Sequence, residues 1–483
     1  MNFKRIFLFI FIASLGGCAA LKKRENAPAV SQNVNLKPSL DQAVSKGDFI
    51  EGDWPDWNWW EQFEDDQLTS FMEQALDDNP DLKAAVSRVR SSQQEAKKTR
   101  SVLFPQFSTS FEDDYQHLSK DSLDRFPPSN LPAVINQINL KLNFEYEIDL
   151  FGKNRETYRA ALGEARSQKA EMSQAYLMIT ASLAEAYFDY QANLLRIGAQ
   201  EEVVKMQEAF VDLTKQRVLN KIDDEITLEK AQASLLEAKE VLTQLEKDLA
   251  LSKSQIKILM GLSPDDDLYF QLPDARFNRP FPLPENLPVN LLVRRPDLMV
   301  QIWKVEAAAH LIGAARAAFF PNINLASFVG LESLSWNKLF SLDSFAGAIS
   351  PAINLPLFTG WRLSAGLEKS FADFDTAVFD YNSLILKAAK EVSDGLKILQ
   401  ASNREASFQI EVVGKMTRAT DLTYARFQNG ISDYLEVIEI NLDLLQQVIR
   451  EIDIQNKRHL AVLNLIRALG GGYYQEKVEV KNP

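Results

Sequence analysis

One stretch of unbroken alternation, residues 138–150, constrains the possible folds of this chain more than any other feature. Every second side chain is apolar: Ile138, Leu140, Leu142, Phe144, Tyr146, Ile148 and Leu150. Because successive side chains of a strand point to opposite faces, a strand here has one apolar face and one polar face. A half-buried strand of a soluble sandwich has the same pattern, but such strands run to about 5–6 residues. About ten residues tilted across a bilayer match the length better, which favours a membrane β-barrel.

The composition describes a folded, acidic protein. The chain has 483 residues, of which 46% are hydrophobic and 25% charged, enough for two or more cores. Its formal charge of −13 becomes −15 if Lys4 and Arg5 are removed with a signal peptide. This charge, without a basic patch that carries aromatic residues, argues against a nucleic-acid partner.

The N-terminus has the pattern of an export signal. Lys4 and Arg5 precede an apolar run over residues 6–15, followed by Gly16, Gly17 and Cys18. A charged start, a short apolar run and a small-residue cleavage site are typical of a signal peptide, here residues 1–17. The apolar run is too short to span a membrane.

Cys18 is the only cysteine, so an intramolecular disulfide is impossible. Leu15-Gly16-Gly17-Cys18 resembles the bacterial lipobox, which implies an acyl lipid on Cys18 and no other cofactor. The alternative is an ordinary signal peptide with an incidental cysteine. Ala19 stands where an aspartate would signal inner-membrane retention, which favours the outer membrane of a Gram-negative bacterium.

The second half of the chain repeats the first. Asn79-Pro80-Asp81-Leu82 opens one amphipathic helix and Arg295-Pro296-Asp297-Leu298 opens another, and each ends at a Phe-Pro pair. Two predicted strands follow each helix, and a helical hairpin follows each strand pair. The first repeat, 76–261, has strands 106–115 and 138–150 and hairpin 153–260. The second, 295–470, has strands 322–334 and 345–357 and hairpin 361–469. The strand at 322–334 alternates poorly. A lipid-anchored tether and equatorial segment (18–75), an equatorial linker (262–294) and a C-terminal tail (471–483) complete the predicted domains.

Each hairpin is interrupted once, at residues 217–224 and 426–433. Four residue types recur there 209 positions apart: Arg217, Asn220, Ile222 and Asp224 match Arg426, Asn429, Ile431 and Asp433. Apolar residues step by three and four along both hairpins, which specifies coiled-coil packing. An arm of about 65 residues is roughly 100 Å long. We expect Lys221, Ile222, Gly430 and Ile431 to lie at the two tips and to contact a periplasmic partner.

Four strands cannot close a sheet in lipid, where each exposed backbone group costs several kcal/mol. Two, three or four chains would give 8, 12 or 16 strands, and eight would be filled by side chains. Small polar residues on one face of the last strand suggest an open bore, which leaves three or four chains. The predicted protein is a channel whose helices span an aqueous compartment.

The chain resembles the outer-membrane efflux lipoproteins of the OprM and TolC type. The resemblance rests on residues 59–63 and 76–82, and above all on Leu291 to Leu298 followed by Ile312 to Pro321. It implies a mainly α fold with a membrane β-barrel, formed by a homotrimer with a 12-stranded barrel, a 12-helix periplasmic tunnel and an equatorial collar. It also implies a periplasmic adaptor, an inner-membrane transporter of the RND type, and a role as the exit duct of a tripartite efflux system.

Two departures from the family bear on the tips. Lys221 stands where the family usually has glycine, as at Gly430. Ser432 and Thr227 replace the arginine and aspartate of the TolC-type latch, which puts that ion pair in doubt.

Past the second tip, Ser432, Glu436, Glu439 and Asp443 step by four, three and four. This stripe aligns with the aspartates of the TolC constriction. We therefore predict a periplasmic gate that lines the lumen with Asp433, Glu436, Glu439 and Asp443. The alternative is the solvated outer face of the coil, because spacing does not fix direction.

The sequence has no catalytic constellation, and we expect no enzymatic activity. His117, His310 and His459 lack a cysteine or second histidine at metal-ligand spacing. Asp265-Asp266-Asp267 lacks the pattern of a calcium loop, and Arg294-Arg295 before a helical proline is explained as structural. Two alternative functions remain: an exit duct for secreted proteins, which would have the same fold, and a trimeric coiled-coil surface adhesin.

Overall fold

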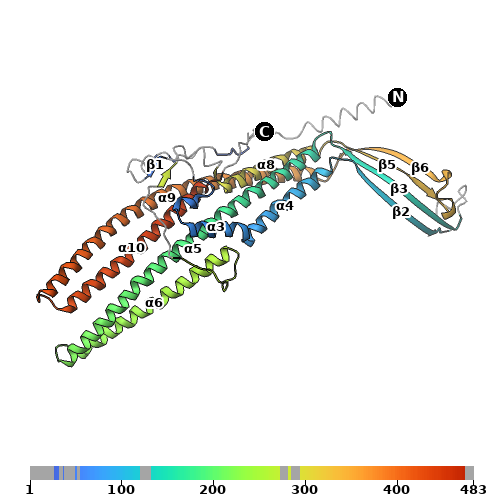
Figure 1. Cartoon of the computed structure of the whole chain (residues 1–483). Helices are drawn as coiled ribbons and strands as arrows, with labels where there is room; N and C mark the ends of the chain where they lie inside the picture. Colours follow the sequence, from blue (N-terminus) through green and yellow to red (C-terminus); the bar gives the residue numbers. More distant parts are fainter. Residues whose placement is uncertain are drawn as a thin grey trace.

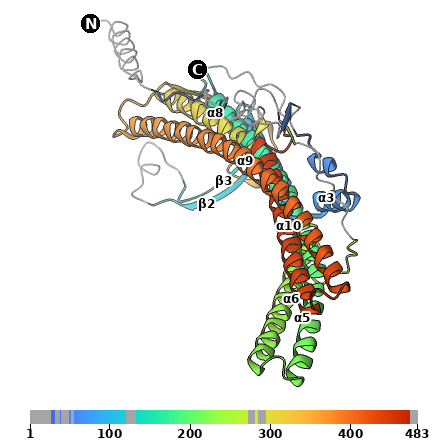
Figure 2. The same cartoon turned by 90° about the vertical axis from the view of Figure 1, so that its left-hand side faces the viewer.

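The computed structural model describes residues 27–31, 36, 38, 49–51, 55–119, 132–271, 281–283 and 294–473. The molecule is long and narrow, with a β-sheet at one end and two helical hairpins reaching to the other (Figure 1). Viewed from the hairpin end, the helices form a curved layer (Figure 2). This shape matches one sector of a tube.

The four long strands form one antiparallel sheet in the order β2-β3-β5-β6. Their bounds are Gln106–His117 (β2), Val134–Ile148 (β3), Asn322–Ser333 (β5) and Phe345–Asn354 (β6). The predicted end of the 138–150 strand is wrong: β3 starts at Val134 and ends at Ile148. The Asp149 carboxylate accepts hydrogen bonds from the backbone N–H groups of Asn154 and Arg155 at 3.1 and 2.8 Å, so it belongs to the start of the next helix. The predicted end of the 345–357 strand is also wrong: β6 ends at Asn354, which pairs with Asn322, the residue where β5 begins.

The two faces of the sheet differ sharply. On one face, Phe107, Phe111, Phe345, Ile349 and Ile353 are all more than half exposed. On the other face, cross-strand neighbours are polar or small, as in the row Glu112, Asn139 and Glu332 and the pair Ala326 and Ser350. The register also explains the poor alternation of β5, because Phe328 and Gly330 lie on the polar face while Leu325, Val329 and Leu331 keep to the apolar one.

The helices extend from the sheet as two long rods and several shorter ones. α5 (Lys153–Leu219) and α9 (Arg362–Gln428) have 67 residues each, or roughly 100 Å at 1.5 Å per residue. α6 (Glu225–Leu259) and α10 (Tyr434–Leu469) return from the tips and stop about halfway. α4 (Pro80–Ser101) and α8 (Pro296–Ala317) pack beside the long rods in the half nearer the sheet.

The short helices meet end to end, and the repeated Pro-Asp-Leu motifs make the joints. In the first repeat the Asn79 side-chain amide donates to the Leu259 carbonyl, 2.8 Å away, at the end of α6. In the second repeat the Arg295 guanidinium donates to the Ala468 carbonyl at 2.9 Å, near the end of α10. Each side chain therefore satisfies a terminal carbonyl that has no partner within its own helix.

Arg295 is 6% exposed and is also paired with two carboxylates. Its guanidinium donates to Asp297 at 3.0 and 2.7 Å and to Glu391 at 2.7 Å. These contacts, together with that to Ala468, join α8, α9 and α10. The structural interpretation of this arginine is confirmed.

The equatorial core lies around α3 (Asp66–Asp78), which packs on α5. Trp59, Trp60 and Phe63 are 2% exposed there, so the aromatic segment before α3 is an anchor on the body. Asp65 caps α3 and accepts a hydrogen bond from the Tyr187 hydroxyl at 2.7 Å. The short parallel pair β1 (Phe49–Glu51) and β4 (Phe281–Leu283) was not predicted, because three residues carry no readable alternation.

Candidate functional site

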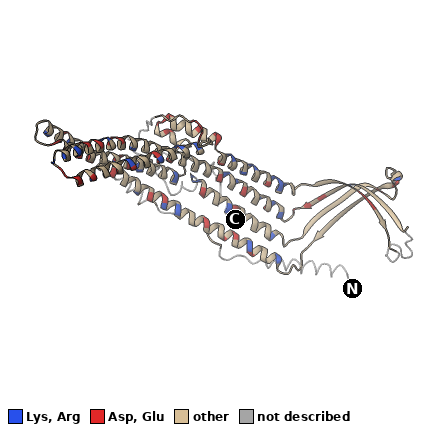
Figure 3. Cartoon of the chain, turned by 90° about the horizontal axis from the view of Figure 1, so that it is seen from below, with Lys and Arg blue, Asp and Glu red and all other residues tan. Residues whose placement is uncertain are grey.

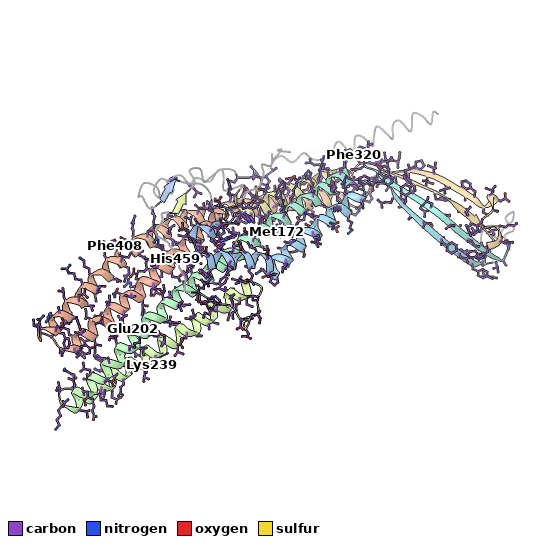
Figure 4. The ribbon with its side chains drawn as sticks, in the orientation of Figure 1. Met172, Glu202, Lys239, Phe320, Phe408 and His459 are labelled. Carbon is purple, nitrogen blue, oxygen red and sulfur yellow. The ribbon has the colours of Figure 1, made fainter. Side chains whose placement is uncertain are left out.

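The membrane-facing part of the molecule is marked by aromatic residues at both ends of the sheet. At the end nearer the helices, Phe151 stacks on Phe320 with ring centroids 4.7 Å apart, and Figure 4 shows Phe320 at this junction. Trp361 is also exposed there. At the far end Trp336 lies over Phe111 with centroids 5.8 Å apart. Aromatic girdles flanking an apolar band are typical of a transmembrane β-barrel, so the apolar face of the sheet faces lipid. Charged side chains are dense along the helices and sparse on the sheet (Figure 3).

The two hairpin tips have the same backbone turn. Lys221 and Gly430 both adopt left-handed conformations, with φ of +60° and +69°. The preceding asparagines donate to helical carbonyls four residues back, at 2.8 Å for Asn220 and 2.7 Å for Asn429. Lys221 therefore occupies a glycine-type position, and the departure from the family pattern changes the residue without changing the turn.

The aspartates that follow the tips cap the returning helices. Asp224 accepts from the backbone N–H of Thr227 at 2.9 Å, and Asp433 accepts from that of Glu436 at 3.1 Å. The Thr227 hydroxyl also donates to Asp224 at 2.7 Å. Thr227 thus belongs to a helix cap.

Arg217 links the two hairpins. Its guanidinium pairs with Asp223 in its own tip at 2.7 Å, and its Nη1 lies 3.6 Å from Asp433 of the other hairpin. The hydrogen bond that the Arg217 guanidinium donates to the Asp223 carboxylate is the main reason that the pKa of Arg217 is raised above its ordinary value. Sequence reasoning missed this ion pair, although the recurrence of Arg217 as Arg426 and of Asp224 as Asp433 was a signal for it.

The four predicted gate carboxylates lie at the start of α10. Asp433 is the cap, and Glu436 lies 3.4 Å from Arg426 across the second tip. Glu439 and Asp443 are exposed one and two turns further along. Their direction relative to a lumen stays a prediction.

The tips present exposed apolar side chains. Ile222 is 62% exposed and Ile431 is 68% exposed, and Leu219 and Ile226 beside Ile222 are 68% and 64% exposed. Lone exposed apolar residues are common, but a group at the end of a rod is typical of a contact surface.

The longest described piece of the tether is residues 27–31. The Asn382 side chain on α9 accepts from the Ser31 N–H at 2.8 Å and donates to the Ala29 carbonyl at 3.1 Å. The Asn382 amide thus binds the main chain of the tether at two residues, Ala29 and Ser31. Cys18 lies outside the described residues, so its lipidation stays a prediction.

The three histidines lie far apart in sequence and in different surroundings. His310 Nδ1 lies 2.6 Å from Glu156 Oε2, between α8 and α5. His459 is half-buried and packs against Phe188, at the equatorial level where Figure 4 labels it. In the part of the chain that the structure describes, no group of three or more potential ligands is arranged to hold a metal ion. None of the described helices is long and apolar enough to cross a membrane.

Comparison with solved structures identifies the fold. VceC from Vibrio cholerae superposes with a TM-score of 0.78 at 29% identity, covering 87% of this chain and all of that one. The Campylobacter jejuni CmeC outer membrane channel superposes with a TM-score of 0.83 at 20% identity, with 95% of both chains covered. The predicted fold class is therefore confirmed: a trimer with a 12-stranded β-barrel above a 12-helix tunnel. The polar face of the sheet lines the bore.

Sequence relatives agree with the structural ones. The multidrug resistance outer membrane protein MdtQ of Escherichia coli O157:H7 is 28% identical over 97% of this chain and 98% of its own. MdtP of Escherichia coli K12 is 26% identical over 95% and 94%. The sequence profile described as outer membrane efflux protein matches residues 71–262 and 287–471. The chain therefore belongs to the outer membrane efflux protein family and is an outer-membrane channel.

Proposed function

We propose that this channel is the exit duct of a tripartite efflux system and passively conducts small molecules from an inner-membrane pump to the outside. The observation that carries the proposal is the distance between the lipid-facing sheet and the tips. Rods of 67 residues hold the apolar tips roughly 100 Å from the membrane. A protein that only perforated the outer membrane would not need such rods.

From the sequence we expect no energy source in the channel itself, so a partner pump must supply the energy for transport. The partners that fit are a periplasmic adaptor at the tips and an inner-membrane transporter of the RND type. Relatives named for multidrug resistance support efflux of small molecules over protein secretion. The relatives are channels, which argues against the adhesin alternative.

The tips supply the adaptor contact in this proposal. Ile222 and Ile431 project from equivalent turns, next to Lys221 and Gly430. A few well-packed residues at the centre of a contact contribute most of its binding energy. The Arg217–Asp433 ion pair lies just behind them, so an adaptor that docks at the tips can act on the link between the two hairpins.

Photo-crosslinking in cells tests the proposal. A photoreactive residue at position 222 or 431 should capture a periplasmic protein, with the pump recovered in the same complex. Position 269 is the matched control, because Tyr269 is 79% exposed but lies in the equatorial segment. Capture at 269 with none at 222 and 431 would refute docking at the tips.

We also propose that Cys18 carries the acyl lipid and that the 27–31 segment leads from this anchor to the equatorial core. The lipobox resemblance supports the modification, and the hydrogen bonds to Asn382 support the route. Metabolic labelling with radioactive palmitate tests it directly.

A further inference from the structure

The bore face of the sheet carries one cluster that the channel function does not explain. Lys141 on β3 lies directly opposite Gly330 on β5. The ammonium of Lys141 is 2.6 Å from the Glu332 carboxylate and 4.7 Å from the centre of the Phe328 ring. Phe328, Gly330 and Glu332 are alternate residues of one strand, so all three point to the bore side.

Gly330 lets β5 lie close against β3 at the position of Lys141. A Cβ at this position would come within 2.1 Å of the Leu140 carbonyl oxygen, so no other residue fits without moving the backbone. The same Cβ would lie 2.8 Å from the Lys141 Cα, so glycine at this position allows the close approach of the two strands. The Lys141 ammonium thus reaches both the Phe328 ring and the Glu332 carboxylate, which flank Gly330 along β5.

The exposure of the cluster shows that the lysine does not extend into open solvent. The Lys141 side chain is only 24% exposed and the Glu332 side chain 34%. A lysine is stable when its aliphatic stem packs against a ring and its ammonium pairs with a carboxylate. Phe328 is also the only aromatic residue among the bore-facing positions of the described strands.

We propose that Phe328 and Glu332, on either side of Gly330, hold Lys141 flat against the wall and so keep three ammonium groups of the trimer out of the permeation path. The rest of the bore face then presents small and amide side chains together with the carboxylates of Glu112, Asp114, Glu145 and Glu147, of which Glu147 pairs with Lys153. In the trimer this favours positively charged solutes over anions at this level. The inference rests on the channel function proposed above and adds the class of substrate that the bore admits most easily.

Residue-resolved acetylation of intact outer membranes tests the position of Lys141. A membrane-impermeant acetylating reagent is applied, and modification of Lys141 is measured by mass spectrometry relative to the exposed Lys338 of the outer loop. We expect slow modification in the native chain. E332Q should speed it by about threefold, the population change that loss of one surface ion pair produces. F328A, which removes the cation–π contact, should independently speed it by about the same factor.

E112Q is the matched control. Glu112 lies opposite Asn139, which lies opposite Glu332, so E112Q removes the same charge at the same depth without touching Lys141. It should leave Lys141 modification unchanged. Equal acceleration by E112Q, or native Lys141 as reactive as Lys338, would overturn the proposal.

A cysteine reporter measures the consequence for charged solutes. In S350C, the ratio of reaction rates with cationic and anionic thiol reagents added from outside reports the local potential, and the chain without S350C gives the Cys18 background. E332Q should shift this ratio toward the anionic reagent more than E112Q does, and K141M should remove the difference. No difference between E332Q and E112Q would refute the proposal, while the adaptor crosslinks of the proposed function would be unaffected.

Discussion

Replacing Arg295 with alanine should lower the stability of the trimer more than any surface change nearby. The substitution leaves Asp297 and the Ala468 carbonyl without the guanidinium that now lies 2.7 and 2.9 Å from them. Breaking a buried ion pair from one side costs about 3–5 kcal/mol. Glu391 adds little to this loss, because its side chain is 54% exposed.

The expected change in melting temperature follows from the chain length. An unfolding entropy of about 2.1 cal/mol/K per residue gives roughly 1 kcal/mol/K for 483 residues. A loss of about 3–5 kcal/mol therefore lowers the melting temperature by about 3–5 °C. The measurement is the temperature at which detergent-solubilised trimer converts to monomer, followed by gel electrophoresis and by circular dichroism.

Two further variants distinguish the effect of the Arg295 hydrogen bonds from the effect of its charge alone. Arg295→Lys keeps the charge but loses the planar, multiply donating head, so it should fall between alanine and the native chain. Lys390→Ala breaks an exposed pair with Asp394 on α9 and should leave the melting temperature unchanged. The argument fails if Arg295→Ala melts with the native chain or if Lys390→Ala melts as early as Arg295→Ala.

Four further outcomes are expected. Glu436→Ala/Glu439→Ala should reduce cation selectivity and block by trivalent cations in planar bilayers, and unchanged currents would place both carboxylates outside the lumen. Asn382→Ala should leave the trimer intact but expose the 27–31 segment to protease. Asn382→Asp keeps the acceptor for Ser31, so its segment should be cleaved less. Equal cleavage of the native protein and both variants would argue against the contact. Cys18→Ser should fold and assemble without incorporating palmitate, and incorporation by the variant would disprove the lipidation site. Burial lowers the pKa of His459 from 6.5 to about 4, so between these pH values the unfolded chain binds a proton and the folded chain does not. The free energy of unfolding should therefore fall as the pH drops through this window, by at most about 3 kcal/mol. His459→Phe should flatten this pH dependence, and a pH dependence that persists in the variant would show that other groups cause it.

The sequence alone determined the architecture because its signals are local and periodic. Alternation over 138–150 requires a two-faced strand whatever it pairs with, and a heptad requires a coiled coil. The 209-residue recurrence of Arg217, Asn220, Ile222 and Asp224 fixed the equivalence of the two tips. Closure of the sheet by several chains followed from the cost of unpaired backbone in lipid.

The tertiary structure decided the contacts between segments far apart in sequence, which no local pattern encodes. That Asn79 and Arg295 each satisfy the end of another helix depends on where α6 and α10 stop. The Arg217–Asp433 pair depends on two separate hairpins lying side by side. In the sequence, Phe328 only interrupts the alternation of its strand. The register of β3 against β5 is what brings Lys141 over its ring.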